Sequence, residues 1–354
     1  MYSSSDGPHG LLLLDKPTGI TSHDLVGRVR RGLHTRKVGH AGTLDPAATG
    51  LMLVGVGDAT RLLTYLVADE KEYETTVRLG IATDTEDADG EVTSVSPAEQ
   101  VDGITIALVH DAADRFVGPI DQVPSAVSAI KVDGKRAYQR VRDGEEVELA
   151  ARRITVHELK VLRLAHGEVG GHRVADLDLR VRCSAGTYIR ALGRDLGNAL
   201  GVGAHLSSLR RASIGSFHVR EAVALVAQRP ERESAEATAE AAQLRDALVP
   251  LPEFLALRFP HFIAADAAQS RALRNGQRIA APEMIELPLA ATSRHRTPES
   301  PSHEPATSIP AGDLKPETPV AVFGTNGEPI GLLEVSGGRT RTLMNFPQRD
   351  GVAS

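Results

Sequence analysis

One short segment, GHAGTLDP at residues 39–46, has the residue types of a reactive loop. It lacks a helical or strand period, and its glycines let the backbone approach a bulky ligand closely. The proline after Asp45 biases that residue toward extended backbone, from which its carboxylate can project into a cleft. An Asp before Pro more often forms an Asx-turn, and local chemistry alone leaves that alternative open. Asp45 is therefore a candidate catalytic carboxylate that needs support from other parts of the chain.

The sequence contains no recognisable cofactor site. Asp84, Asp87, Asp89 and Gly90 are spaced like part of a calcium-binding loop, but alignment on Gly90 leaves Ser96 where the bidentate glutamate belongs. No cluster of His or Cys has the spacing of a zinc site, and no Gly-rich loop ends in Lys-Ser or Lys-Thr. We therefore expect any chemistry to proceed without a metal or cofactor.

Three predicted elements carry further polar side chains toward this loop. The segment LLLLDKPTG at residues 11–19 indicates a buried strand and a turn, and Thr21 or Ser22 can cap the helix that follows. Residues 73–79 alternate as a strand, which places Tyr73 on the apolar face. A second alternating strand ends near residue 183, and the helix after it has Tyr188 and Arg190 in its first turn, on either flank of its apolar stripe.

The net charge of -6 argues mildly against a nucleic-acid binder, but the charges are segregated. No acidic residue lies between Asp24 and Asp45, and none lies between Asp195 and Glu221. These two segments contain the basic residues Arg28, Arg30, Arg31, Arg36, Lys37, Arg210, Arg211 and Arg220. This distribution favours a polyanionic partner, although uneven surface charge is common.

Composition indicates an ordinary globular protein of 354 residues with 41% hydrophobic residues. The only cysteine is Cys183, so no disulfide can form within the chain. The first residues lack the layout of a signal peptide, and no apolar run approaches the length of a membrane span. We expect a cytoplasmic location.

The fold class that we expect is α+β, with a mixed, largely antiparallel sheet flanked by helices over residues 9–250. Residues 121–152 are polar and basic and indicate a mobile excursion, and a helical, Ala- and Glu-rich stretch spans roughly 221–248. Two strands near the C-terminus predict a small β domain over 252–350. Residues 288–316 are rich in Pro, Ser and Thr, which predicts a disordered insertion in that domain.

Five blocks of sequence together resemble the bacterial TruB family of tRNA pseudouridine synthases. They are, in order, LLLLDKPTGITSHD, GHAGTLDPAATGLMLVGVGDATR, KEYETTVRLGIATDTEDADGE, CSAGTYIRALGRDLG and GAHLSSLRR. The resemblance is strong over about residues 9–225 and holds only in outline beyond, as an RNA-binding domain of the PUA type. It implies conversion of the uridine at position 55, in the T arm of tRNA, to pseudouridine.

The resemblance also implies a role for each matching residue. Asp45 would be the catalytic nucleophile, Arg190 its ion-pair partner, and Tyr73 the residue that stacks on the target base. The substrate-binding residues would be His40, Tyr188, Leu209 and Lys16. His40 would support the flipped-out form of the RNA, Tyr188 and Leu209 would line the uracil pocket, and Lys16 would support the floor of the site. On charge, we assign the RNA backbone to Arg28, Arg31, Arg36, Lys37, Arg210 and Arg211.

Three alternatives stay open. An RNA-binding or RNA-folding protein without turnover would explain the basic segments but gives no role to Asp45. A hydrolase with an aspartyl nucleophile usually needs a metal and a second carboxylate, which the loop does not offer. A relative that modifies another uridine is the third. The resemblance is to the stand-alone bacterial form, so we expect no obligate protein partner.

Overall fold

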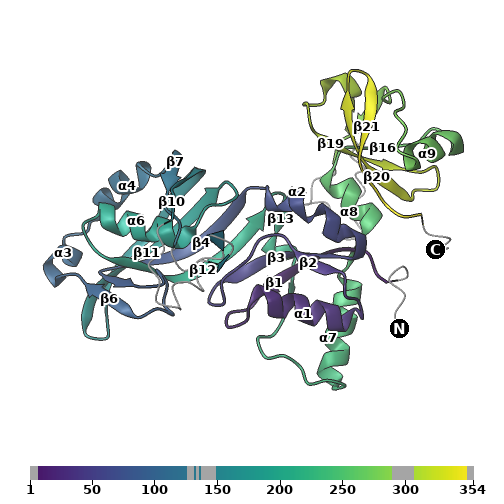
Figure 1. The fold of residues 1–354 in the computed structure, drawn as a ribbon. Coiled ribbons are helices and arrows are strands. Elements are labelled where there is room, and N and C mark those ends of the chain that lie inside the picture. Colours follow the sequence, from purple (N-terminus) through teal and green to yellow (C-terminus); the bar gives the residue numbers. More distant parts are fainter. Residues whose placement is uncertain (1–6, 126–130, 133–134, 137–148, 289–306, 349–354) are drawn as a thin grey trace, which may run out of the picture.

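The chain folds into a large mixed sheet with helices and a smaller β domain beside it (Figure 1). The structure, a computed structural model, describes residues 7–125, 131–132, 135–136, 149–288 and 307–348. Most of the excursion predicted at 121–152, and residues 289–306 of the predicted insertion, lie outside the described residues. The predicted fold class, α+β with a mixed and largely antiparallel sheet, is confirmed.

The large sheet has eleven strands among the described residues, and its main path runs β14-β1-β3-β12-β4-β11-β10-β7. Its strands are β1 (Gly10–Lys16), β2 (Val38–His40), β3 (Thr49–Val56), β4 (Lys71–Leu79), β7 (Gly118–Gln122), β10 (Arg152–Val169), β11 (His172–Cys183), β12 (Ala204–Ile214), β13 (Phe217–His218), β14 (Val223–Ala224) and β15 (Val249–Pro250). Only β1–β14 and β3–β12 are parallel pairs. Two small hairpins lie outside it: β5 (Ile81–Thr83) with β6 (Val92–Val95), and β8 (Lys131–Val132) with β9 (Lys135–Arg136).

The parallel contact between β3 and β12 joins the two halves of the sheet. It involves only Arg210 opposite Thr49 and Arg211 opposite Gly50. Gly50 has φ +105°, and a Cβ built on it would lie 2.3 Å from the carbonyl oxygen of Arg211. A glycine is required there, because any side chain would separate the two strands.

Helices cover both faces of the β1–β3 part of this sheet and one face of the rest. The helical elements of this part are α1 (Ser22–Gly32), η1 (Gly57–Leu62), α2 (Leu63–Val67), α3 (Ala98–Asp102), α4 (Ile106–Asp114), α6 (Ile189–Ala199), η2 (Val219–Glu221) and α7 (Ala235–Asp246). Leu12 of β1 shares one apolar cluster with Leu25 of α1. Leu13 shares the cluster on the opposite face with Leu66 of α2.

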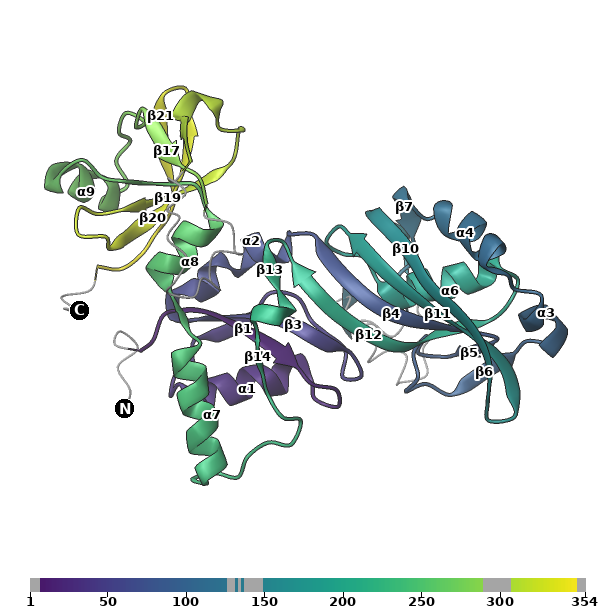
Figure 2. The ribbon, with the colours of Figure 1, turned by 180° about the vertical axis from the view of Figure 1, so that it is seen from behind.

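Figure 2 shows β12, β4, β11 and β10 in front of α6, on the face away from the helices. That face carries cross-strand ion pairs such as Arg78–Asp176 and Arg163–Asp178, which suit exposure to water.

Caps and glycines position α1, which lies next to the Asp45 loop, and α6, which carries Arg190. Thr21 caps α1 in a capping box with Asp24, as the sequence predicts. The N-cap of α6 is Tyr188, which makes no side-chain cap of its own. Gly193 and Gly197 let α6 approach β12 closely, since a Cβ on Gly197 would lie 2.4 Å from the Cβ of Ala204.

Two boundaries predicted from composition need correction. Helix α7 begins only at Ala235, and the earlier part of the stretch predicted at 221–248 contains β14 and irregular backbone. The insertion predicted to be disordered over 288–316 extends too far, because Ser308–Pro310 forms β18, paired with β17 (Met284–Glu286). Ile309 lies opposite the buried Ile285, and strand pairing outweighs a composition that is poor in large apolar residues.

The terminal β domain contains a sheet of six strands among the described residues, ordered β18-β17-β16-β19-β20-β21. Its other elements are α8 (Leu251–Arg258), β16 (His261–Ile263), α9 (Ala267–Arg274), η4 (Ala311–Asp313), β19 (Pro319–Phe323), β20 (Pro329–Ser336) and β21 (Arg339–Asn345). Phe254 and Leu255 of α8 share one apolar cluster with Leu11 of β1 and Phe323 of β19. The terminal domain is therefore packed against the large sheet through α8. No helix in the described part of the chain is long and apolar enough to cross a bilayer.

Substitution of Gly197 by Val tests whether glycine packing positions α6. We expect the free energy of unfolding to fall by about 1–3 kcal/mol, because the added side chain overlaps Ala204 and pushes the helix off the sheet. Denaturant unfolding followed by circular dichroism measures this. Asn198→Ala, an exposed position in the same helix, should change stability by less than about 0.5 kcal/mol. Equal stability of Gly197→Val and wild type would contradict the proposed packing constraint.

Candidate active site

The loop that carries Asp45 connects β2 to β3 and is held by the side chains of Ser22, Lys16 and Arg211. The Ser22 hydroxyl, buried at the start of α1, donates to the Leu44 carbonyl and accepts from the Leu44 amide, both at 2.9 Å. The ammonium group of Lys16 donates to the Pro46 carbonyl at 3.1 Å and to Ile20 at 2.7 Å. These bonds hold the residues on either side of Asp45, and the sequence analysis did not identify Ser22 as one of the holding residues.

Lys16 is fully buried, so it supports the floor of the site and is not placed to touch a substrate. Its assignment as a substrate-binding residue is corrected accordingly. Burial lowers its pKa to about 8, and the neighbouring Asp45 carboxylate opposes that fall. A lysine that donates to several carbonyls in the interior is a structural cation under the loop.

Arg211 supports the loop from the other side. Its guanidinium donates to the carbonyls of Leu51 at 2.8 Å, Gly42 at 3.2 Å and Thr43 at 3.4 Å, and the residue is only 1% exposed. A buried guanidinium that donates to three internal carbonyls cannot reach the RNA backbone. The RNA-backbone assignment of Arg211 is therefore wrong, because its charge is used to order the loop.

The structure brings Asp45 and Arg190 together, as the resemblance implies. Nε of Arg190 donates to the carboxylate of Asp45 at 3.0 Å. The Arg190 side chain is 8% exposed and that of Asp45 is 41% exposed. The pair therefore has a fixed, buried cation beneath a carboxylate that is open to a ligand, and the direction of the carboxylate is set by a charge-assisted bond.

Arg190 has further partners that sequence reasoning missed. Its Nη1 donates to the Thr85 carbonyl at 2.7 Å and to the Ser125 hydroxyl at 3.2 Å. A second carboxylate, Asp87, lies 3.6 Å from Nε and is mostly buried. Asp87 was considered only as part of a calcium loop, since its approach to Arg190 depends on a loop that folds back to Leu206. Two carboxylates thus face one guanidinium.

Gln122, the last residue of β7, holds the beginning of α6. Its side-chain oxygen accepts from the Tyr188 amide at 2.9 Å and its nitrogen donates to the Tyr188 carbonyl at 3.0 Å. Gln122 is 2% exposed. It binds both backbone groups of the N-cap residue, so it orients the first turn of α6 and Arg190 with it. Tyr188 itself is half-buried.

Tyr73 and His40 lie where their polar atoms are largely removed from water. Tyr73 is buried among apolar residues, in register with Arg211 on β12. Burial raises the pKa of Tyr73, so its phenol stays protonated at neutral pH. Burial also lowers the pKa of the half-buried His40, which favours the neutral imidazole. Both residues therefore offer flat, uncharged rings.

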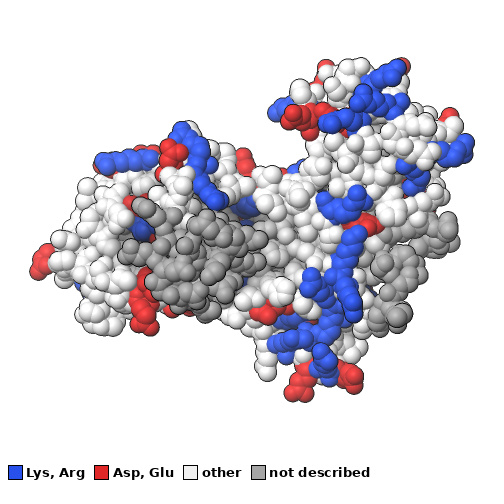
Figure 3. All heavy atoms as spheres, viewed as in Figure 1, with Lys and Arg blue, Asp and Glu red and all other residues white. Residues whose placement is uncertain are grey.

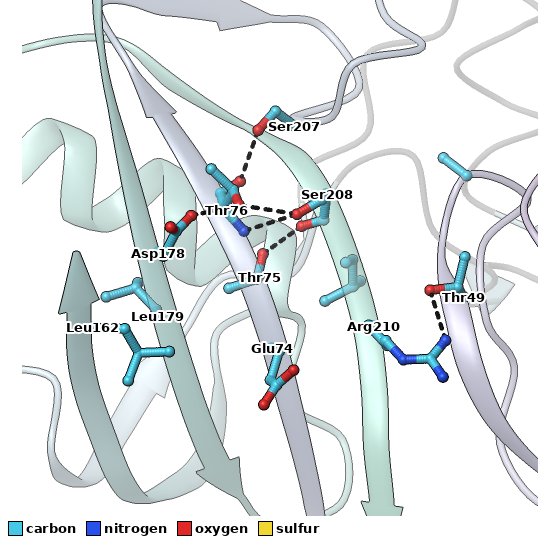
Figure 4. Close-up of a pocket in the computed structure, with 12 residues that line it drawn as sticks. Thr49, Glu74, Thr75, Thr76, Leu162, Asp178, Leu179, Ser207, Ser208 and Arg210 are labelled. Carbon is cyan, nitrogen blue, oxygen red and sulfur yellow. Dashed lines mark hydrogen bonds between the residues drawn. The ribbon is translucent and has the colours of Figure 1, made fainter. Parts of the chain in front are cut away.

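Leu209 is half-buried and lines a cavity of about 510 Å³ together with Thr75, Ser208 and Arg210 (Figure 4). Asp45, Tyr73 and Arg190 are not among the residues that line this cavity. Arg210 pairs with Asp15 at 2.6 Å and keeps 40% of its side chain exposed. The structure therefore does not bring Leu209 into one cavity with the Asp45–Arg190 pair.

The remaining basic residues assigned to the RNA backbone differ in exposure. Arg28 is 2% exposed and its guanidinium binds Glu240, so that assignment is also wrong. Arg36 and Lys37 are exposed, and Lys37 pairs with Asp58 at 2.6 Å. Arg31 is half-buried. Figure 3 shows a band of Lys and Arg side chains on the α1 side of the molecule.

Metal-binding and thiol chemistry find no support in the part of the chain that the structure describes. No group of three or more His, Cys, Asp or Glu side chains there could hold a metal ion. Burial raises the pKa of the Cys183 thiol to about 11, which disfavours a reactive thiolate.

Solved structures with a similar fold include two RNA-protein particles. The chain matches a structure of an H/ACA RNP bound to a substrate RNA containing 2'-deoxyuridine, with TM-score 0.61 and 24% identity, over 96% of this chain and 86% of that chain. It also matches an archaeal box H/ACA sRNP Nop10-Cbf5 complex, with TM-score 0.60 and 23% identity, over 96% and 87% of the two chains. At this identity the likeness shows the fold alone.

Curated relatives are much closer in sequence. The chain is 43% identical over 338 residues to the protein named tRNA pseudouridine synthase B of Leifsonia xyli subsp. xyli, covering 96% of both chains. It is 48% identical over 270 residues to the protein of that name in Thermobifida fusca, covering 76% of this chain and 86% of that one.

Two family profiles match consecutive parts of the chain. The N-terminal domain of TruB family pseudouridylate synthases matches residues 30–189, which include Asp45 and Tyr73. The C-terminal domain of tRNA pseudouridylate synthase B matches residues 190–256, which begin at Arg190 and end within α8. With these matches and the identity over nearly the full length of a relative, the chain belongs to the TruB family of pseudouridylate synthases.

Proposed function

We propose that this protein converts a uridine of tRNA to pseudouridine, with Asp45 as the catalytic nucleophile and without a cofactor. The observation that carries the proposal is the pair formed by the exposed Asp45 carboxylate and the buried Arg190, on a loop fastened by internal bonds. Family membership supports the reaction, since close relatives carry the name tRNA pseudouridine synthase B. Activity on tRNA would place the protein in the cytoplasm.

The chemistry of the isomerisation fits these side chains. The glycosidic bond of the uridine breaks, the uracil turns, and it is reattached through carbon 5. An ionised carboxylate is a competent covalent catalyst at neutral pH. The buried guanidinium of Arg190 stabilises negative charge on Asp45 and sets its direction. Attack on the sugar and attack on the base both use the ionised carboxylate of Asp45 as the nucleophile.

Access to the uridine requires that it leave the stacked RNA, and the remaining predicted residues suit that step. Tyr73 offers an uncharged ring as a stacking partner for the base. Because burial raises its pKa, little phenolate is present to remove the proton from carbon 5, so we assign Tyr73 to stacking. We propose that His40 supports the flipped-out RNA and that Tyr188 and Leu209 line the uracil pocket. The exposed Arg36, Lys37 and Arg210 are the cations that we assign to phosphates.

For the substrate position we propose uridine 55 in the T arm, and action without an obligate protein partner. Both follow from the resemblance to the bacterial family. The runner-up function is binding or folding of RNA without turnover, which the exposed basic band would also serve. The two functions differ in whether Asp45 is needed after RNA has bound.

Asp45→Asn separates them. A tRNA T-arm stem-loop with tritium at carbon 5 of its uridines should release tritium with the wild-type protein, because carbon 5 loses its hydrogen when it bonds to the sugar. The variant should release none, since an amide is not a nucleophile of this kind, while its affinity for the stem-loop stays within about threefold. Release by the variant, or no release by wild type despite tight binding, would return Asp45 to a turn residue.

Ser22→Ala tests whether the hydrogen bonds at Leu44 position Asp45. The change leaves a buried amide and carbonyl without their partner, so we expect a loss of about 1–3 kcal/mol in stability. At a temperature where the variant is folded, kcat should fall at least about tenfold with little change in KM, because a misdirected carboxylate affects the chemical step most.

Ser96→Ala is the matched control, because the Ser96 hydroxyl accepts from the Gly203 amide at 3.1 Å in a region away from the Asp45 loop. It should lose stability but keep kcat. If Ser22→Ala and Ser96→Ala have the same kcat as wild type, the bonds at Leu44 serve stability only.

A further inference from the structure

The segment of residues 226–246, which follows β14 and includes α7, is fastened to α1 by a buried ion pair. The guanidinium of Arg28 binds both carboxylate oxygens of Glu240 on α7, and its Nη1 donates to the Val226 carbonyl at 2.5 Å. The side chains of Arg28 and Glu240 are 2% and 13% exposed. Burial of two charges costs desolvation free energy, which is offset only when the two groups keep a well-aligned geometry. The ion pair therefore fixes the position of the segment.

Helix packing beside this ion pair confirms close docking. A Cβ built on Gly32 of α1 would lie 2.8 Å from Cδ1 of Leu244 and 3.5 Å from the Cα of Ala241. Ala241 and Leu244 are the buried residues of α7. The segment between Val226 and α7 is therefore held against α1 at both of its ends.

Docking of this segment gathers three arginines. Arg229 and Arg232 are exposed, and the charge of each acts on Arg31. Both lie in the stretch between Val226, whose carbonyl binds Arg28, and Ala241, which packs against Gly32 next to Arg31.

One guanidinium nitrogen of Arg31, Nη2, is buried with no hydrogen-bond partner among the described residues. Glu240, the carboxylate that acts on Arg31, is already engaged by Arg28. The four exposed acidic residues of the segment, Glu231, Glu233, Glu236 and Asp246, are not among the charges that act on Arg31.

We propose that Arg31, Arg229 and Arg232 form a phosphate-binding surface for the RNA substrate, created by the docking of residues 226–246 on α1. Guanidinium groups match phosphate oxygens in charge and geometry. Figure 3 shows basic side chains gathered on the side of the molecule where α1, the helix of Arg31, lies. The choice of RNA as the ligand rests on the proposed function.

The surface is close to the Asp45 loop. Helix α1 has 11 residues and is therefore about 16 Å long. Ser22 at its first turn binds Leu44, next to Asp45, while Arg31 is in its last turn. An RNA that places one nucleotide at Asp45 has several of its backbone phosphates within this distance, so the same molecule can occupy both sites.

The double variant Arg229→Ala/Arg232→Ala tests this, because both side chains are exposed and the fold should survive. Affinity for unmodified tRNA transcript is measured by fluorescence anisotropy over a range of KCl concentrations. We expect Kd at low salt to rise about tenfold, and the slope of log K against log salt to become shallower by about one to two. The kcat for tritium release at saturating tRNA should stay unchanged.

Arg115→Ala/Lys160→Ala removes the same charge from exposed positions far from α1 in the chain and serves as the control. An effect on Kd equal to that of the control, or none at all, would overturn the proposed surface. Wild-type tritium release in the same preparations tests the reaction separately. If the double variant loses affinity but the wild-type protein releases no tritium, the surface stands and the proposed reaction is wrong. If the wild-type protein releases tritium but the double variant keeps its affinity, the reaction stands and the surface is wrong.

Discussion

The ion pair between Asp45 and Arg190 joins two residues that are 145 positions apart in the chain. One comes from a loop between β2 and β3, and the other from the first turn of α6. Neither segment would keep this geometry alone, because a loop and a helix start both have unsatisfied backbone groups. Much of the surrounding structure serves to hold these two segments in place, so that Nε of Arg190 stays 3.0 Å from the Asp45 carboxylate.

Near Asp45 and near Arg190, a polar side chain binds both the amide and the carbonyl of one backbone residue. Ser22 binds the amide and the carbonyl of Leu44, and Gln122 binds those of Tyr188. These four hydrogen bonds replace contacts with water that burial removes, so the peptides can be ordered without an unsatisfied group. The same arrangement leaves the Asp45 carboxylate as the exposed member of the pair.

Besides Arg190, three other buried cations order parts of the structure. Lys16, Arg28 and Arg211 are each at most 2% exposed, and each donates to internal carbonyls or carboxylates. A charge in the interior is costly unless it is fully bonded, and for that reason these side chains are tied to one geometry. Lys16 and Arg211 order the catalytic loop, while Arg28 fastens the α7 segment to α1. Basic residues in one stretch of sequence thus divide into structural cations and surface cations.

The sequence by itself determined the reactive loop, the alternating strands, the capped helix α1 and the mixed fold class, because these depend on local periodicity, turn residues and capping. It also pointed to Asp45 and Arg190 through the resemblance of five ordered blocks. It could not distinguish Arg28 and Arg211 from Arg36, since burial of an arginine depends on which distant carbonyl or carboxylate reaches it. For the same reason Ser22, Gln122 and Asp87 became visible only in the tertiary structure, where chain segments far apart in sequence supply each other's hydrogen-bond partners.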